Sequence, residues 1–98
     1  MAENFQFEWN SRKSESNKRK HGIEFAFACR VFADPLRHTD IEGHEHGEIR
    51  WRTIGEIDGV LIVIVSHTTR EEGQTEVIRI ISARRAGRRE RQTYEEAP

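Results

Sequence analysis

The sequence predicts a single α+β domain over residues 1–98, with two N-terminal helices packed on an antiparallel meander sheet and a C-terminal helix. Two observations predict this class. Helical patterns cover residues 11–33 and 83–95, and strand-like alternation covers most of the stretch between them. The strand-like segments follow one another through short turns, which favours sequential antiparallel pairing. With 35% hydrophobic and 34% charged residues, the domain is expected to have a small core.

The chain is expected to begin with an edge strand and a polar helix. Phe5 and Phe7 alternate with polar residues, which is typical of a short strand. Asn10 has the side chain of a helix N-cap. The helix that follows ends at Gly22, directly after cations that interact favourably with the negative end of the helix dipole.

A second helix is predicted over residues 24–33. Phe25, Ala28, Cys29 and Phe32 have the i, i+3, i+4, i+7 spacing of one apolar stripe, and the following Asp-Pro pair ends the helix. Cys29 is therefore interpreted as a small buried hydrophobic residue without a redox or nucleophilic role, and a single cysteine excludes an internal disulfide.

The segment of residues 36–47 is ambiguous. Residues 38–41 are compatible with an edge strand, whereas residues 42–47 suggest a loop. In that loop His44-Glu45-His46 offers common metal-ligand types, but no second cluster with ligand spacing accompanies it. We therefore expect no metal site and no cofactor.

Three strands are predicted in the second half of the chain. Residues 48–54 alternate, with Ile49, Trp51 and Thr53 toward the core and charged residues on the other face. A hairpin turn at 57–60 leads to residues 60–65, which are apolar on both faces and suit a central strand. A looser turn over residues 70–74 returns the chain into a strand over residues 76–81.

The junction after this last strand is a possible phosphate site. Ser82 is expected to cap a helix over residues 83–95 that places Arg84, Arg88 and Arg91 along one side. Guanidinium groups beside free backbone N–H groups would hold phosphate well. The alternative is a solvated basic helix, in which Arg84 caps a helix end or pairs with Glu90.

Charge is distributed unevenly along a chain whose net charge is −1. Residues 1–22 carry five Lys or Arg against three acids, residues 23–76 carry five against eleven, and residues 77–98 carry six against three. The basic ends would form a positive patch if they meet in space. No apolar run is long enough to span a membrane and no leader pattern is present, so we expect a cytoplasmic protein with no membrane partner.

Motifs along nearly the whole chain occur in the order and spacing of one known family. They are Phe7-Glu8-Trp9-Asn10, Asn17, Lys20-His21-Gly22, Phe25, Ala28, Val31-Phe32, Asp34-Pro35, Glu48-Ile49-Arg50, Gly55, the strand 60–65, the block 78–86, Glu90-Arg91 and Tyr94. With these motifs the sequence resembles the BrnT-type toxins. The resemblance implies a RelE-like fold, a ribonuclease that arrests translation, and neutralisation by a BrnA-type ribbon-helix-helix antitoxin. It also implies a toxin–antitoxin heterotetramer that contacts operator DNA only through the antitoxin.

Cleavage of RNA by its own 2'-hydroxyl needs a base, cations that stabilise the phosphorane and a proton donor, and it needs no metal. We predict that Arg79 and Arg84 bind the scissile phosphate and that His21 or Glu48 is the general base. The further predicted RNA- or phosphate-binding residues are Lys20, Arg50, Arg70, Arg88, Arg91, Trp9 and Tyr94.

Two alternatives remain at this stage. His21 can simply cap the first helix at its C-terminus, where cations are favourable. The whole basic face can also belong to a non-catalytic module that binds nucleic acid or a protein. A partner that covers exposed surface is expected to raise the stability of the small domain by mass action.

Overall fold

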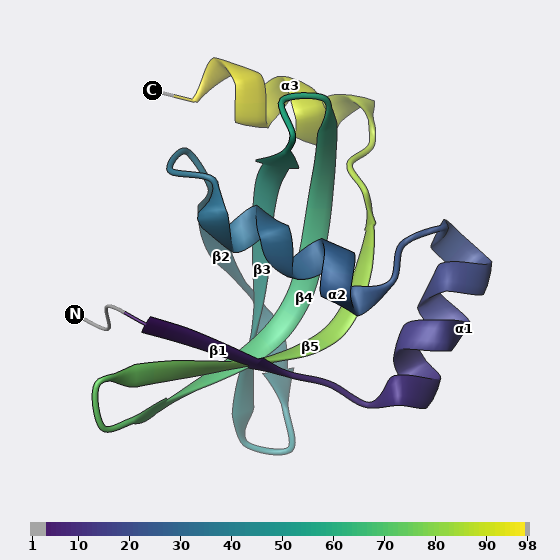
Figure 1. Ribbon diagram of the computed structural model, residues 1–98. Helices are drawn as coiled ribbons and strands as arrows, with labels where there is room; N and C mark the ends of the chain where they lie inside the picture. The colour runs from purple at the N-terminus through teal and green to yellow at the C-terminus, as the bar shows by residue number, and fades with distance from the viewer. Residues whose placement is uncertain (1–3, 98) are drawn as a thin grey trace.

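The computed structural model describes residues 4–97. They form one five-stranded, mostly antiparallel sheet with helices around it (Figure 1). The elements in chain order are β1 (Asn4–Glu8), α1 (Ser11–His21), α2 (Phe25–Ala28), the 3₁₀ helix η1 (Cys29–Ala33), β2 (His38–Glu45), β3 (Glu48–Ile57), β4 (Leu61–Glu72), β5 (Thr75–Arg85) and α3 (Arg88–Glu96).

The strand order is β1-β5-β4-β3-β2, so the predicted meander is confirmed and β4 is its central strand. The hairpin connection between β3 and β4 spans residues 58–60, with positive φ at Asp58 and Gly59 and a hydrogen bond of 3.2 Å from the Val60 N–H to the Ile57 carbonyl oxygen. β1 adds at the edge beside β5, as expected, and runs parallel to it. The N-terminal strand therefore lies next to the last strand of the sheet.

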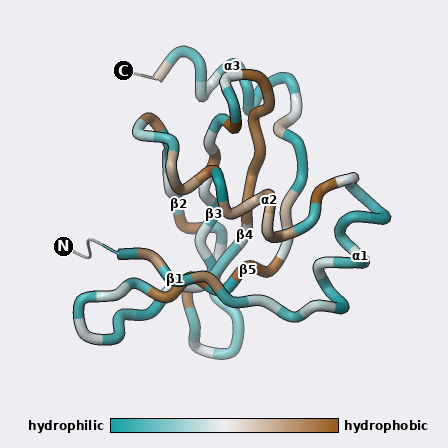
Figure 2. Tube along the Cα trace, viewed as in Figure 1, coloured by the Kyte–Doolittle hydropathy of each residue, from teal (hydrophilic) through white to brown (hydrophobic). Residues whose placement is uncertain are grey.

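One face of the sheet, which we call the core face, is covered by α2 and η1. Phe25, Ala28 and Val31 are fully buried there against Val63 and Val65 of β4. Figure 2 shows the same division, with apolar residues along β4 and in the α2 region and hydrophilic residues along α1 and α3. The largest apolar cluster thus lies in one layer between the sheet and these helices, and Ile62, Ile64 and Val77 are buried on the opposite face of the sheet.

β3 and η1 approach each other closely at Gly55. A Cβ atom at this position would lie 2.9 Å from the Val31 carbonyl oxygen. Only glycine accepts this distance without a shift of η1. The close approach brings η1 down onto the sheet and completes the core layer.

The second predicted helix is only partly α-helical. Its first turn is α2, and the chain then tightens into η1 up to Ala33. The apolar stripe is buried as predicted, except that Cys29 is only half-buried. Burial raises the pKa of the Cys29 thiol to about 11, so the group remains a neutral thiol at neutral pH.

The predicted end of the last strand is wrong. β5 continues through Ser82 to Arg85, and α3 begins at Arg88. Ser82 lies within the ladder to β4 and caps no helix. The long-range pairing with β4 outweighs the local capping preference of serine. The helix start lies at Gly87, whose N–H donates to Glu90 Oε1 at 2.7 Å.

Three loop boundaries also differ from prediction. Residues 42–45, predicted as loop, belong to β2, and the turn is confined to His46 and Gly47, both with positive φ. β4 runs on to Glu72, so the turn predicted over residues 70–74 is much shorter. Val60, predicted to start the central strand, is 82% exposed in the hairpin turn.

α1 packs beside β5 through one buried polar side chain. Asn17 donates to the Ala83 and Ile23 carbonyl oxygens at 2.8 and 2.7 Å, and it accepts from the Ala83 N–H at 3.1 Å. Because β1 pairs with β5 only as far as Arg79, the Asn17 amide takes the place of a neighbouring strand at Ala83. Within residues 4–97, no helix is long and apolar enough to cross a membrane.

Candidate functional site

The face of the sheet opposite α2 and η1, which we call the outer face, carries the charged residues of the three inner strands. Alternation along β3 places Arg50 and Arg52 there, because Trp51 and Thr53 point toward the core face. The register aligns Arg52 with Ser66, Thr68 with Arg79, and Ile64 with Arg84. Of the arginines predicted to bind phosphate, Arg50, Arg79 and Arg84 therefore share one face of the sheet.

A bulge in β5 is needed for this arrangement. Arg79 and Arg84 are five residues apart, so they would point to opposite faces of a regular strand. The pairing with β4 shifts between Ser66 and His67, where Ile81 is the extra residue. Ile80 and Ala83 are consequently both buried in the core, and both arginines are exposed on the outer face.

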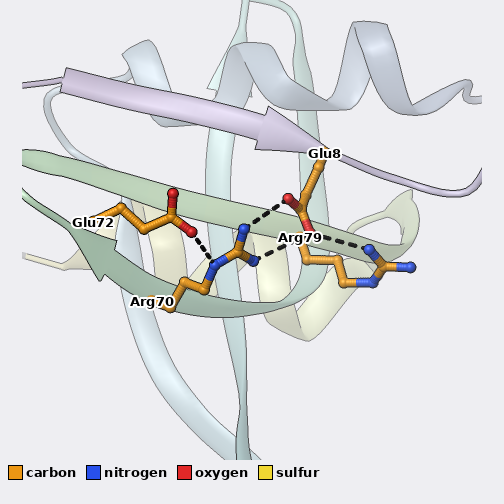
Figure 3. A network of polar contacts seen from close by, with 4 residues as sticks. All are labelled: Glu8, Arg70, Glu72 and Arg79. Atoms are coloured by element: carbon orange, nitrogen blue, oxygen red, sulfur yellow. Dashed lines mark hydrogen bonds and ion pairs between the residues drawn. The ribbon is translucent and has the colours of Figure 1, made fainter.

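Glu8 connects the N-terminal strand to two of these arginines (Figure 3). Arg70 donates to both Glu8 carboxylate oxygens, at 3.0 and 3.2 Å, and Arg79 donates to Oε2 at 3.0 Å. Arg70 also donates to Glu72 at 2.6 Å. The hydrogen bonds from Arg70, and to a smaller extent that from Arg79, lower the pKa of Glu8. The carboxylates of Glu8 and Glu72 in turn raise the pKa of Arg70.

Arg84 joins β5 to the first turn of α3. Its two terminal nitrogens donate to the two Glu90 oxygens at 2.8 and 2.7 Å, so the ion pair proposed as the simpler alternative is present. Chiefly because of Arg84, the pKa of Glu90 falls to about 2. The pKa of Arg84 is raised by the same bonds. The guanidinium group is thereby held in one orientation over the sheet.

A third cluster surrounds Arg50. This side chain lies 2.7 Å from a Glu45 oxygen and 3.9 Å from a Glu42 oxygen, and Glu42 accepts a hydrogen bond of 2.9 Å from Ser66 Oγ. Glu42 sits at a second register shift, in β2, and points over the neighbouring strands. Glu48 begins β3, is exposed and forms no side-chain hydrogen bond or ion pair within the described residues.

Lys20 and His21 are exposed in the last turn of α1, where Gly22 ends the helix with φ of 74°. Within residues 4–97 no side-chain hydrogen bond or ion pair joins either of them to the outer-face arginines. The local capping arrangement at this helix end is as predicted, and the roles predicted for the two side chains stay predictions.

The remaining predicted binding residues lie around the edges of the sheet. Trp9 is half-buried and packs against the core cluster. The Tyr94 hydroxyl donates a hydrogen bond to the Asp34 carboxylate. Desolvation, and to a smaller extent this hydrogen bond, raises the pKa of Tyr94. Arg88 and Arg91 are exposed on α3, and Arg84, predicted to share that helix with them, lies on β5 instead.

Sequence reasoning anticipated Glu90 as a partner of Arg84, but it missed the carboxylates that hold the other arginines. Glu8 is 62 residues from Arg70 in the sequence, and no local pattern connects them. Glu42 was hidden because it falls in the segment assigned to a loop. Within the part of the chain that the structure describes, no group of three or more His, Cys, Asp or Glu residues could hold a metal ion.

Comparison with known proteins gives a match to one protein family and a match in fold to a solved structure of that family. Residues 9–90 match the family described as the ribonuclease toxin, BrnT, of type II toxin-antitoxin systems. A crystal structure of the Brucella abortus ribonuclease toxin, BrnT, is 23% identical, with a TM-score of 0.57, over 87% of this chain and 99% of that chain. No curated protein matches the sequence. At this identity the structural match supports the fold.

Proposed function

The chain belongs to the BrnT family of ribonuclease toxins of type II toxin–antitoxin systems, and from this premise we propose that it cleaves RNA at the outer face of its sheet without a metal ion. The 2'-hydroxyl of the substrate loses its proton to the general base and attacks the adjacent phosphorus, and the bond to the 5'-oxygen breaks, so that this oxygen leaves as a hydroxyl after protonation. Arginines stabilise the negative charge that develops on the phosphorane. We also propose that the fold is RelE-like and that cleavage arrests translation.

The observation that carries this proposal is the shared face of Arg50, Arg79 and Arg84. Each guanidinium group is oriented by a carboxylate, and each retains N–H groups that those carboxylates do not use: Arg79, for example, donates to Glu8 through Nη1 alone. Arginine has five donors, so it can hold a carboxylate and a phosphate oxygen together. Orientation before substrate binding reduces the reorganisation needed in the transition state.

We assign Arg79 and Arg84 to the scissile phosphate, with Arg50 and Arg70 as further phosphate ligands. For the general base, the alternation along β3 favours Glu48, which shares the outer face with Arg50, and His21 is the alternative. The proposed contacts to flanking RNA are made by Lys20, Trp9, Arg88, Arg91 and Tyr94.

The test is RNA degradation in the presence of a chelator, with wild type, Arg79→Ala and Arg84→Ala. We expect each variant to lose about a hundredfold or more of the cleavage rate, the usual effect of removing one donor to a developing oxyanion. Arg12→Ala is the matched control, because Arg12 is exposed on α1 and makes no side-chain ion pair within residues 4–97. Equal rates in all four proteins, or cleavage only with added metal, would refute the mechanism.

The family implies a protein antitoxin as partner. We propose a BrnA-type protein with a ribbon-helix-helix part that contacts operator DNA, in a heterotetramer with this chain, in the cytoplasm where translation takes place. A neighbouring reading frame that encodes such a protein, and a higher melting temperature of the toxin in its presence, are the expected results. An unchanged melting temperature would contradict the pairing.

A further inference from the structure

A pocket of about 320 Å³ lies between α3 and the outer face of the sheet. Ile54 and Ile64 form its apolar part, and the rings of Tyr94 and His38 line it with their centroids 6.1 Å apart. Asp40, Arg52 and Glu90 supply its polar groups. The volume lies at the small end of the range for ligand pockets, about 300–1,000 Å³, which suits one small planar group.

Two opposite charges, Asp40 and Arg52, line this pocket. Asp40 and Arg52 are directly opposite each other in the β2–β3 register, and both are exposed. Opposite charges in such positions commonly interact. Within residues 4–97, however, neither forms a side-chain hydrogen bond or an ion pair, whereas Arg50, Arg70, Arg79 and Arg84 all do. Both groups are therefore available to a ligand.

The pocket adjoins the arginine proposed to bind the scissile phosphate. Glu90 lines the pocket and also holds Arg84 through two hydrogen bonds. Arg52 is close enough to Glu90 to contribute to the low pKa of that carboxyl group. A group bound in the pocket would therefore lie one side chain away from the phosphate site.

We propose that this pocket binds one base of a single-stranded RNA and that Asp40 and Arg52 recognise it, with a preference for guanine. Guanine presents two adjacent donors, N1–H and the N2 amine, to a carboxylate, and two adjacent acceptors, O6 and N7, to a guanidinium fork. The other three bases cannot offer both pairs. The Tyr94 ring provides the aromatic surface against which an unstacked base packs.

This inference rests on the proposed function, because it makes the pocket the element that selects the cleavage site. Its test separates binding from cleavage. The full chain is titrated with GMP, AMP, CMP, UMP and IMP, and the shifts of backbone amide signals are followed by NMR. All five ligands carry the same phosphate, so differences between them report on the base. IMP lacks only the N2 amine of guanine.

We expect GMP to bind about tenfold more tightly than AMP, CMP or UMP, and IMP to bind with intermediate affinity, with shifts at β2, β3 and α3. Asp40→Asn should abolish the preference, since the amide can no longer accept two hydrogen bonds from guanine. Glu71→Gln is the control: it removes one negative charge from an exposed position near the β4–β5 turn, and it should retain the preference for guanine.

Cleavage mapping on an RNA that contains all four bases completes the test. Wild type should cut beside guanine, and Asp40→Asn should still cut but with reduced selectivity. Equal affinities for all five nucleotides, or a guanine preference that survives in Asp40→Asn, would overturn the pocket assignment even if RNA is cleaved. A guanine preference in a protein that cleaves no RNA would support the pocket and refute the proposed function.

Discussion

Substitution of Asn17 is the most informative test of how α1 is joined to the edge of the sheet. The Asn17 amide makes three hydrogen bonds, with Ala83 N–H, the Ala83 carbonyl and the Ile23 carbonyl, and the residue is only 6% exposed. In Asn17→Ala the backbone groups of Ala83 lose their partners at a buried site. Leaving a buried backbone group without a partner costs about 1–3 kcal/mol, so we expect the variant to lose about 2–4 kcal/mol of unfolding free energy.

This loss is a large fraction of the about 5–15 kcal/mol that a small domain has in total. It corresponds to a decrease of at least about 8 °C in melting temperature for a chain of this size. Urea unfolding and thermal unfolding followed by circular dichroism measure both quantities. Asn10→Ala is the matched control, because Asn10 Oδ1 accepts one exposed hydrogen bond from Lys13 N at 3.1 Å, and loss of such a cap costs about 1 kcal/mol.

The same substitution should also affect the candidate functional site. Ala83 precedes Arg84, so loosening the edge of β5 should also weaken the positioning of that guanidinium group. If the unfolding free energy of Asn17→Ala lies within about 0.5 kcal/mol of the wild-type value, the reasoning about the sheet edge is wrong. A destabilisation no larger than that of Asn10→Ala would lead to the same conclusion.

Three other predictions concern stability. Burial lowers the pKa of His67 below its ordinary value of 6.5, so the unfolded chain binds a proton at this residue more readily than the folded chain. The unfolding free energy should therefore decrease as pH falls below about 6.5. Urea titrations of His67→Gln should show a weaker dependence on pH. The pKa of Glu90 is lowered from 4.5 to about 2. Its contribution should therefore be complete above pH 4.5 and lost as pH falls toward 2, with a flatter acid profile in Glu90→Gln; identical acid profiles would contradict the pairing with Arg84. In Gly55→Ala the added methyl group would lie 2.9 Å from the Val31 carbonyl oxygen, so the unfolding free energy should fall by about 1–3 kcal/mol. If this variant is as stable as wild type, η1 can move freely away from the sheet.

Much of the fold was predictable because the deciding signals are local. Asn10 caps α1 and Gly22 ends it in the left-handed conformation, and both features need only a few neighbouring residues. The pair Asp58-Gly59 forms the hairpin turn for the same reason. Periodicity likewise identified β3 as a strand with one charged face, because the alternation of side chains is a property of the strand alone.

The elements that were predicted incorrectly depend on partners far away in the sequence. Ser82 is a good helix cap in isolation, but β4 supplies a continuous ladder that keeps the chain extended to Arg85. Residues 42–45 resemble a loop in composition, and pairing with β3 makes them a strand. Helices and strands compete for the same residues, and the neighbouring strand decides.

The sequence by itself therefore determined the fold class, the ends of α1 and the arginine-rich composition of the candidate site, since these follow from short-range preferences and from residue type. Only the tertiary structure decided that Arg79 and Arg84 share a face, because this depends on a bulge opposite β4. It alone also showed that Glu8 holds Arg79, and it selected the pairing of Arg84 with Glu90 from the alternatives that the sequence left open. Register and ion pairing join residues that are distant in the chain, and their geometry exists only once the sheet is assembled.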